Sequence, residues 1–189
     1  MPFELPPRPL PVLAGALAAI AFALTLAGCS HVTPLGPAPA ATMPPPRQLG
    51  SPIVMQVMLG KASTPPGGAC PAGYGALSGP GAVGNSGLCY SKLGSPVTFT
   101  SAGVSTGQSG GPTGAEAALM INVPAADRAA LTAITTKAYK AKGYVDISVA
   151  GQTWAIPEAM APLTQGQFEI SLASKNLALR LQRQLDPSS

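Results

Sequence analysis

Acidic residues are scarce in this chain of 189 residues, and none occurs between Ser30 and Ala115. Charged residues make up 10% of the sequence, and the net charge of +4 arises from few acids rather than from many bases. Nucleic-acid-binding domains usually concentrate Lys and Arg in one patch or stripe. The composition therefore argues against nucleic acid as a partner.

Histidine is almost absent as well, because His31, near the amino terminus, is the only one. Nucleophilic catalysis of the Ser–His or Cys–His kind needs such a base, so it is effectively excluded for the rest of the chain. We predict that the protein is not an enzyme, and that Asp146 and Glu169 lie on polar strand faces in contact with solvent. The acids after Ala115 show no pairing at catalytic-motif spacing; they are Glu116, Asp127, Asp146, Glu158, Glu169 and Asp186.

An apolar run rich in Ala and Leu extends from Val12 to Leu26. It is shorter than the roughly 20 residues of a membrane-spanning helix, and it resembles the apolar region of a signal peptide. Leu26-Ala27-Gly28-Cys29 follows and has the form of a lipobox, in which Cys29 is acylated and becomes the first mature residue. An uncleaved signal anchor and an ordinary secretory signal are the alternatives. We predict a signal peptide over 1–28 and a lipid anchor on the extracytoplasmic face of the cell membrane.

Residues 29–51 are rich in proline and favour extended conformations that cannot bury a core. We interpret them as a tether, with a ligand for a proline-recognition domain as the alternative. The folded domain is then expected over 52–189, with a Gly-rich part over 52–115 and a core part over 116–189.

Cys70 and Cys89 remain once Cys29 is assigned to lipid. Outside the cytosol two such cysteines are expected to form a disulfide. The alternatives are weak, because the pair is not C-x-x-C and two thiols without a histidine partner make a poor zinc site. We expect no metal and no cofactor. Gly79-Pro80-Gly81-Ala82-Val83-Gly84 fits G-x-G-x-x-G, but it follows no predicted strand and opens no predicted helix, so we take it as a chance match.

The hydrophobic pattern predicts an α+β fold, with a mostly antiparallel sheet and two helices packed on one face. Pro124 begins the first helix and Gly143 ends it, and the three lysines of its last turn suit the helix carboxyl end better than a lipid surface. Ser174 is expected to cap the second helix. Trp154, beside a hairpin turn, either packs against a helix or is an exposed contact residue. Strands are predicted over 52–59, 88–93, 96–100, 116–123, 144–149, 154–156 and 167–172.

The order of these elements from residue 118 to residue 186 resembles the head subdomain of the first extracytoplasmic loop of SecD, part of the SecDF complex. The family pattern has a hairpin ending in Gly, a small residue before Pro, a Gly, an isoleucine strand and a Leu-rich helix. Ala150 departs from it, since the family usually has Asp before the hairpin Gly. The matching residues here are Gly151, Pro157, Gly166, Ile170, Leu177, Leu181 and Leu185.

The resemblance implies an extracytoplasmic module that binds other proteins, because SecD heads are thought to engage translocated polypeptide. The transmembrane helices of SecD have no counterpart in this chain, so proton-driven transport is not implied. We expect a membrane-anchored, non-catalytic protein-interaction module whose partner is an envelope protein or a translocated polypeptide. A structural or small-ligand-binding lipoprotein is the alternative.

Overall fold

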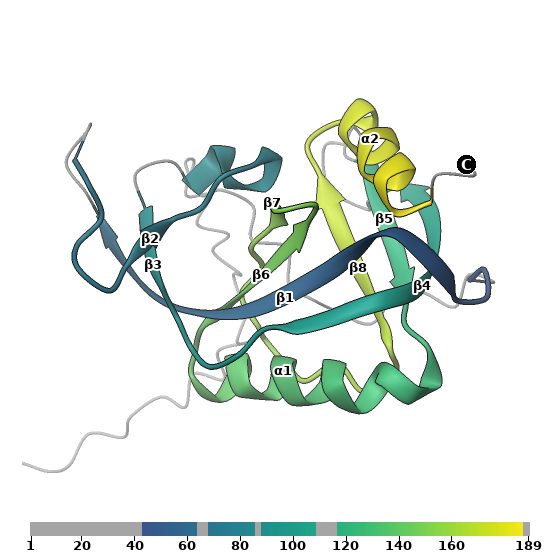
Figure 1. Cartoon of the computed structure of the whole chain (residues 1–189), viewed down its shortest axis with the longest axis horizontal. Helices are drawn as coiled ribbons and strands as arrows, with labels where there is room; N and C mark the ends of the chain where they lie inside the picture. Colours follow the sequence, from purple (N-terminus) through teal and green to yellow (C-terminus); the bar gives the residue numbers. More distant parts are fainter. Residues whose placement is uncertain (1–42, 64–67, 86–87, 109–116, 187–189) are drawn as a thin grey trace, which may run out of the picture.

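The computed structural model describes residues 43–63, 68–85, 88–108 and 117–186, which form an α+β fold (Figure 1). In this part of the chain eight strands make one sheet, and all of their pairings are antiparallel. Two α-helices pack against the sheet, as Figure 1 shows, and the predicted fold class is confirmed. Neither of these helices is long and apolar enough to cross a membrane.

The seven predicted strands and two predicted helices occur in the predicted order, and a short strand over Gly75–Ala76 was not predicted. The helices are α1 (Arg128–Lys140) and α2 (Lys175–Leu185), and two short 3-10 turns are η1 (Pro80–Asn85) and η2 (Ala125–Asp127). The strands are β1 (Arg47–Ser63), β2 (Gly75–Ala76), β3 (Leu88–Lys92), β4 (Val97–Gln108), β5 (Ala117–Asn122), β6 (Tyr144–Val149), β7 (Gln152–Ala155) and β8 (Gln167–Leu172).

Strand β1 is the centre of the sheet. One of its edges pairs first with β4 and then with β3, and the other edge pairs with β6. It is longer than the predicted strand over 52–59, and it overlaps residues 47–51 of the predicted tether. Its pairing with β4 begins at Arg47 opposite Ala102, and a register shift between Gln48 and Ile53 accommodates Pro52. Pairing partners that are distant in sequence therefore lengthen this strand.

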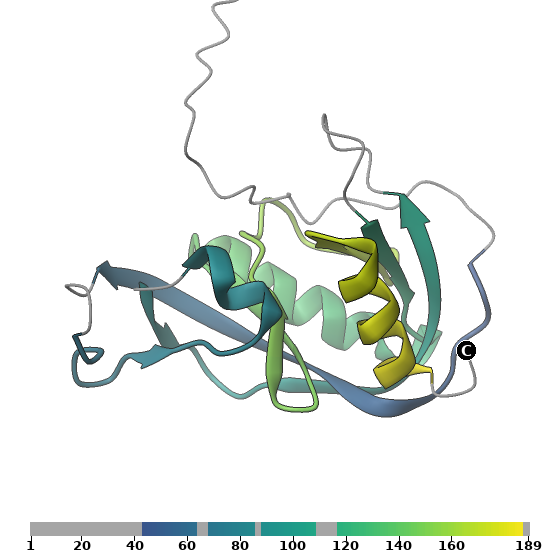
Figure 2. The same ribbon diagram turned by 90° about the horizontal axis from the view of Figure 1, so that it is seen from above.

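The apolar core lies on the inner face of the curved sheet. Alternate residues of β1 and β6 are buried there, as a period of two requires. Both helices add to this one core, and Figure 2 shows them from above. The buried side chains of α1 include Leu131, Ile134 and Ala138, and those of α2 include Ala178, Leu181 and Leu185.

The helix ends were partly predicted. Ser174 caps α2 as expected, because its side chain accepts a hydrogen bond from the Leu177 N–H at 3.3 Å. At the end of α1 the left-handed residue is Lys142, with a φ of 50°, and not Gly143. Gly143 is required for a different reason, since a Cβ there would lie 2.6 Å from the Met58 carbonyl oxygen. The helix end is therefore pressed against β1.

Candidate functional site

Strand β6 separates two environments. Val145, Ile147 and Val149 point into the core, whereas Asp146 and Ser148 point to the opposite face of the sheet, which we call the outer face. The register places Asp146 opposite Gln56 of β1 and Ser148 opposite Thr153 of β7. Polar side chains from three neighbouring strands therefore gather on the outer face.

Residues 70–85, which we call the cover, are attached to this face at several points. A disulfide joins Cys70 to Cys89 of β3, with a Cα–Cα distance of 5.5 Å, which confirms the predicted bridge. Strand β2 within the cover pairs with β3. The Thr153 N–H donates to the Ser78 carbonyl at 2.8 Å and ties the cover to β7. The cover is thus fixed to strands on both sides of β6.

The glycines of the apparent nucleotide motif have a packing role in the cover. Gly79 and Gly81 lie directly on the β7 backbone, and a Cβ at Gly81 would overlap the Trp154 carbonyl group. The segment from Pro80 forms the 3-10 turn η1, and no α-helix follows it in the described part of the cover. Close approach of two backbones accounts for these glycines.

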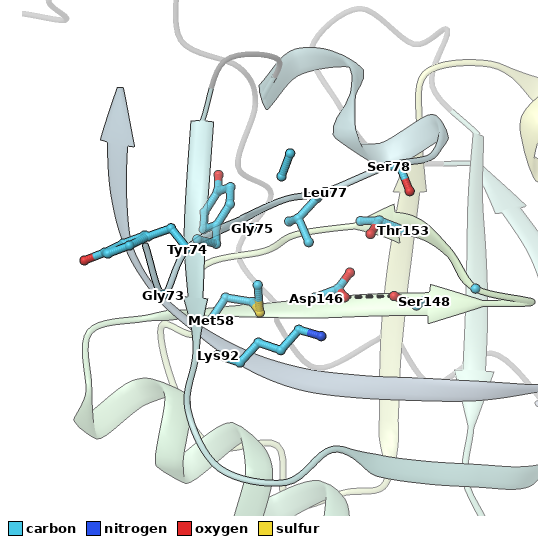
Figure 3. Close-up of a pocket in the computed structure, with 13 residues that line it drawn as sticks. Met58, Gly73, Tyr74, Gly75, Leu77, Ser78, Lys92, Asp146, Ser148 and Thr153 are labelled. Carbon is cyan, nitrogen blue, oxygen red and sulfur yellow. Dashed lines mark hydrogen bonds between the residues drawn. The ribbon is translucent and has the colours of Figure 1, made fainter. Parts of the chain in front are cut away.

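A hollow of about 510 Å³ lies between the cover and the outer face. Figure 3 shows Asp146 and Ser148 on β6, with Leu77 and Ser78 of the cover across from them. The hollow is lined by Met58, Gly73, Tyr74, Gly75, Ala76, Leu77, Ser78, Tyr90, Lys92, Asp146, Ser148, Gly151 and Thr153.

Asp146 is the main titratable group in the hollow, and only 8% of its surface is exposed. The Ser148 hydroxyl donates to its Oδ2 at 2.8 Å, as the dashed line in Figure 3 marks. Its other oxygen, Oδ1, is buried and has no hydrogen-bond partner among the described residues. The prediction that Asp146 is solvated is therefore wrong, because the cover shields a face that the strand pattern marks only as polar.

Burial raises the pKa of Asp146, since desolvation disfavours the charged form. The hydrogen bond from the Ser148 hydroxyl, the nearby Thr153 side chain and then the positive charge of Lys92 act in the opposite direction. Lys92 is exposed at the hollow and forms no ion pair with Asp146. The hollow thus holds one carboxylate and one ammonium group that do not neutralise each other by contact.

Aromatic side chains form the rest of the wall near Lys92. Tyr90 packs edge-on against Tyr144, with ring centroids 5.8 Å apart, and burial followed by the charge of Tyr144 raises the pKa of Tyr90. Tyr74 of the cover is 39% exposed. Tyr74 and Tyr90 line the hollow and provide an apolar flank beside the polar floor, whereas Tyr144 packs behind Tyr90.

Strand β8 repeats the local arrangement of β6 in a different setting. Ser171 donates to Oε1 of Glu169 at 2.9 Å, two residues apart as in Asp146 and Ser148. Glu169 is only partly buried and does not line the hollow. It is neither as shielded as Asp146 nor fully solvated, and it provides a natural comparison for Asp146.

The other predicted site residues fall in several places. Cys29 lies outside the described residues. Gly151 lines the hollow in the β6–β7 turn with a φ of 73°, and Gly166 has a φ of 78° and accepts a hydrogen bond from the Val123 N–H at 2.8 Å. The Pro157 carbonyl accepts from the Val145 N–H at 2.9 Å, and Ile170 is fully buried in the core.

Trp154 belongs to the core, with 1% of its surface exposed. The guanidinium of Arg180, on α2, lies 5.7 Å from the centroid of the Trp154 ring. This position agrees with the predicted packing role of Trp154. A direct contact with a partner needs an exposed side chain, and Trp154 is not exposed.

Sequence reasoning missed the hollow itself, including Ser148, Thr153 and Lys92. The available signal was the polar side of β6 combined with a disulfide-closed loop.

The described residues contain no cluster of three or more His, Cys, Asp or Glu side chains that is able to hold a metal ion. No protein-family model, no curated protein and no solved structure matches the chain.

Proposed function

We propose that this protein is a lipid-anchored, extracytoplasmic binding module that lacks catalytic activity and receives part of a partner in the hollow. The observation that carries the proposal is Asp146, a carboxylate buried under a disulfide-fixed cover with one oxygen unpartnered. A shielded carboxylate that lines a ligand-sized hollow, with a pKa shifted by burial, is a usual feature of a binding site.

The partner class follows from the resemblance to the SecD head. We propose an envelope protein or a translocated polypeptide. In support, the residues that carry the resemblance occupy structurally demanding positions: Gly151 and Gly166 have positive φ, and Ile170 is fully buried. The bridge between Cys70 and Cys89 supports the compartment, because disulfides persist mainly outside the cytosol.

The anchor is tested with the full-length protein and its Cys29→Ser variant, expressed in a bacterium fed labelled palmitate. We expect the wild type to incorporate the labelled palmitate and to occur in the membrane fraction. We expect the variant to lose both properties. Stable anchoring is expected because lipoproteins carry two or three acyl chains. A full-length, unmodified wild-type chain in the cytosol overturns the proposal.

Binding is tested by photocrosslinking at two exposed tyrosines of the lipidated protein. A benzoylphenylalanine at Tyr74 lies at the hollow, and the same residue at Tyr139 of α1 lies outside it. We expect an unfolded model polypeptide to crosslink from position 74 and not from position 139. Equal crosslinking from both positions, or from neither, contradicts a role for the hollow.

A small-ligand-binding lipoprotein is the second candidate. The size of the hollow favours it, since about 510 Å³ falls within the usual range of ligand pockets, roughly 300–1,000 Å³. Protection of position 74 from crosslinking by a small molecule, without any polypeptide binding, supports this candidate over the first.

A further inference from the structure

Two side chains of opposite charge line the hollow without forming an ion pair. Asp146 extends from β6 and Lys92 from β3. Figure 3 shows both side chains on the same side of the sheet. Each therefore keeps unused capacity for a charged ligand group.

Asp146 and Lys92 differ in how much of each side chain is exposed to solvent. Asp146 lines the hollow and is only 8% exposed, so its carboxylate lies at the floor of the hollow. Lys92 is exposed, so its ammonium is accessible from solvent. A ligand that satisfies both must bring a donor to the floor and an anionic group to the rim.

We propose that the hollow binds a small zwitterion, whose ammonium group pairs with the Asp146 carboxylate and whose carboxylate contacts the Lys92 ammonium. This inference rests on the proposed function only in that the hollow is a binding site. A simple amine would be repelled by Lys92, and a simple anion would be repelled by Asp146. Free amino acids and short peptides with both termini free carry the required pair of groups.

The remaining walls suit the body of such a molecule. Ser148 and Thr153 supply hydroxyl groups beside Asp146, while Met58 and Tyr74 supply apolar surface. Hydrogen bonds to charged groups are the stronger ones, and they are stronger still in a site shielded from water. The two charged contacts are therefore expected to dominate affinity.

The experiment uses the full lipidated protein in detergent micelles, with calorimetric titration of L-alanine and of tri-L-alanine. One arm tests a free amino acid and the other tests a peptide. Matched probes are N-acetylated and C-amidated tri-L-alanine, which each lack one charge. We expect at least one unblocked probe to bind, and each blocked form to bind about tenfold or more weakly.

Four variants assign the contacts. Asp146→Asn and Lys92→Gln are each expected to weaken binding about tenfold or more. Glu169→Gln is the control for Asp146→Asn, because it removes a carboxylate from the similar Glu169–Ser171 pair on β8. Lys140→Gln is the control for Lys92→Gln, because it removes an ammonium group from an exposed position on α1. These two controls are expected to bind like the wild type. Thermal melts establish that every variant is folded.

Two results overturn the inference: no binding of either unblocked probe, or binding that Asp146→Asn leaves unchanged. They are distinguishable from failure of the proposed polypeptide binding. If position 74 crosslinks to polypeptide but neither alanine probe binds, only the zwitterion site fails. If an alanine probe binds through Asp146 and no polypeptide crosslinks, the zwitterion site stands and the polypeptide partner fails.

Discussion

The Ser148 hydroxyl lies 2.8 Å from Oδ2 of Asp146, whereas Oδ1 of the same carboxylate accepts no hydrogen bond from any described residue. A half-satisfied buried carboxylate destabilises the folded state when it is charged. A binding site is a place where a protein keeps such a destabilising group. The effect of the Asp146 charge on stability is measurable without knowing the ligand.

The first prediction concerns pH. Burial raises the folded-state pKa of Asp146 above its ordinary value of 3.8. Below that value the carboxyl is protonated in both states and carries no penalty, and stability is lost as the pH rises through the raised pKa. Asp146→Asn is therefore expected to melt at a higher temperature than the wild type at neutral pH. The gap is expected to narrow in acid, as thermal melts from about pH 3 to 8 will show.

Glu169→Gln is the control for this experiment, since it makes the same change outside the hollow. Because Glu169 is only partly buried, Glu169→Gln is not expected to raise the melting temperature at neutral pH. A destabilised Asp146→Asn at neutral pH means that the carboxylate charge supports the fold, and it refutes the assigned cause of the pKa shift.

The second prediction concerns the bridge between Cys70 and Cys89, which are 19 positions apart. Replacing both by Ser frees the chain between them in the unfolded state, and the expected loss in the free energy of unfolding is about 3 kcal/mol. Denaturant unfolding of the double variant against the wild type measures this loss. Because the cover is held there, a ligand of the hollow is also expected to bind more weakly. Unfolding curves that superimpose would refute the stabilising role.

The third prediction tests how the cover rests on β7. Gly81→Ala places a methyl group against the Trp154 backbone, and overpacking of this kind costs about 1–3 kcal/mol. Gly75→Ala is the matched control, because nothing lies within 4 Å of a Cβ there. Limited proteolysis is expected to cut the cover faster only in Gly81→Ala. Equal cleavage of the two variants contradicts the close packing.

The fourth prediction concerns the β6–β7 turn, where Ala150 has a φ of 50° and Gly151 a φ of 73°. A two-residue hairpin with both φ values positive strongly favours Asn-Gly, and a left-handed conformation costs Ala roughly 1–2 kcal/mol. Ala150→Asn is expected to raise the free energy of unfolding by about 1 kcal/mol. Gly151→Ala is expected to lower it by a similar amount. If both changes have the same sign in chemical denaturation, the turn assignment is wrong.

Much of the fold was predictable because its local signals agree. The alternation in β6 and β8 and the helical spacing of Leu131, Ile134 and Ala138 give the correct elements and inward faces. Ser174 was recognisable as a cap because its residue type and position suffice. The disulfide followed from the number of cysteines and the inferred compartment. In each case the deciding information lies within a few residues or in a simple count.

The hollow was not predictable for the opposite reason. Whether Asp146 is solvated depends on where residues 70–85 lie. Their disulfide to β3 was predictable, but their contact with β7, which is distant in the sequence, was not. The early start of β1 at Arg47 likewise depends on Ala102 as its pairing partner. The reason for Gly143 was also not predictable, since glycine is needed there because the Met58 carbonyl lies close by, and not because the helix ends there. Long-range approach leaves little trace in local sequence.

Strand β1 carries core side chains such as Met55 and Val57 on one face, and Met58, which lines the hollow, on the other. The floor of the hollow is thus the reverse side of the same strands that carry the core, and it is lost when the chain unfolds. Any molecule that occupies it must stabilise the folded state by mass action, by about 2.7 kcal/mol at a concentration one hundred times its dissociation constant, and must therefore raise the melting temperature. A library of metabolites can therefore be screened by measuring the melting temperature of the protein in the presence of each compound.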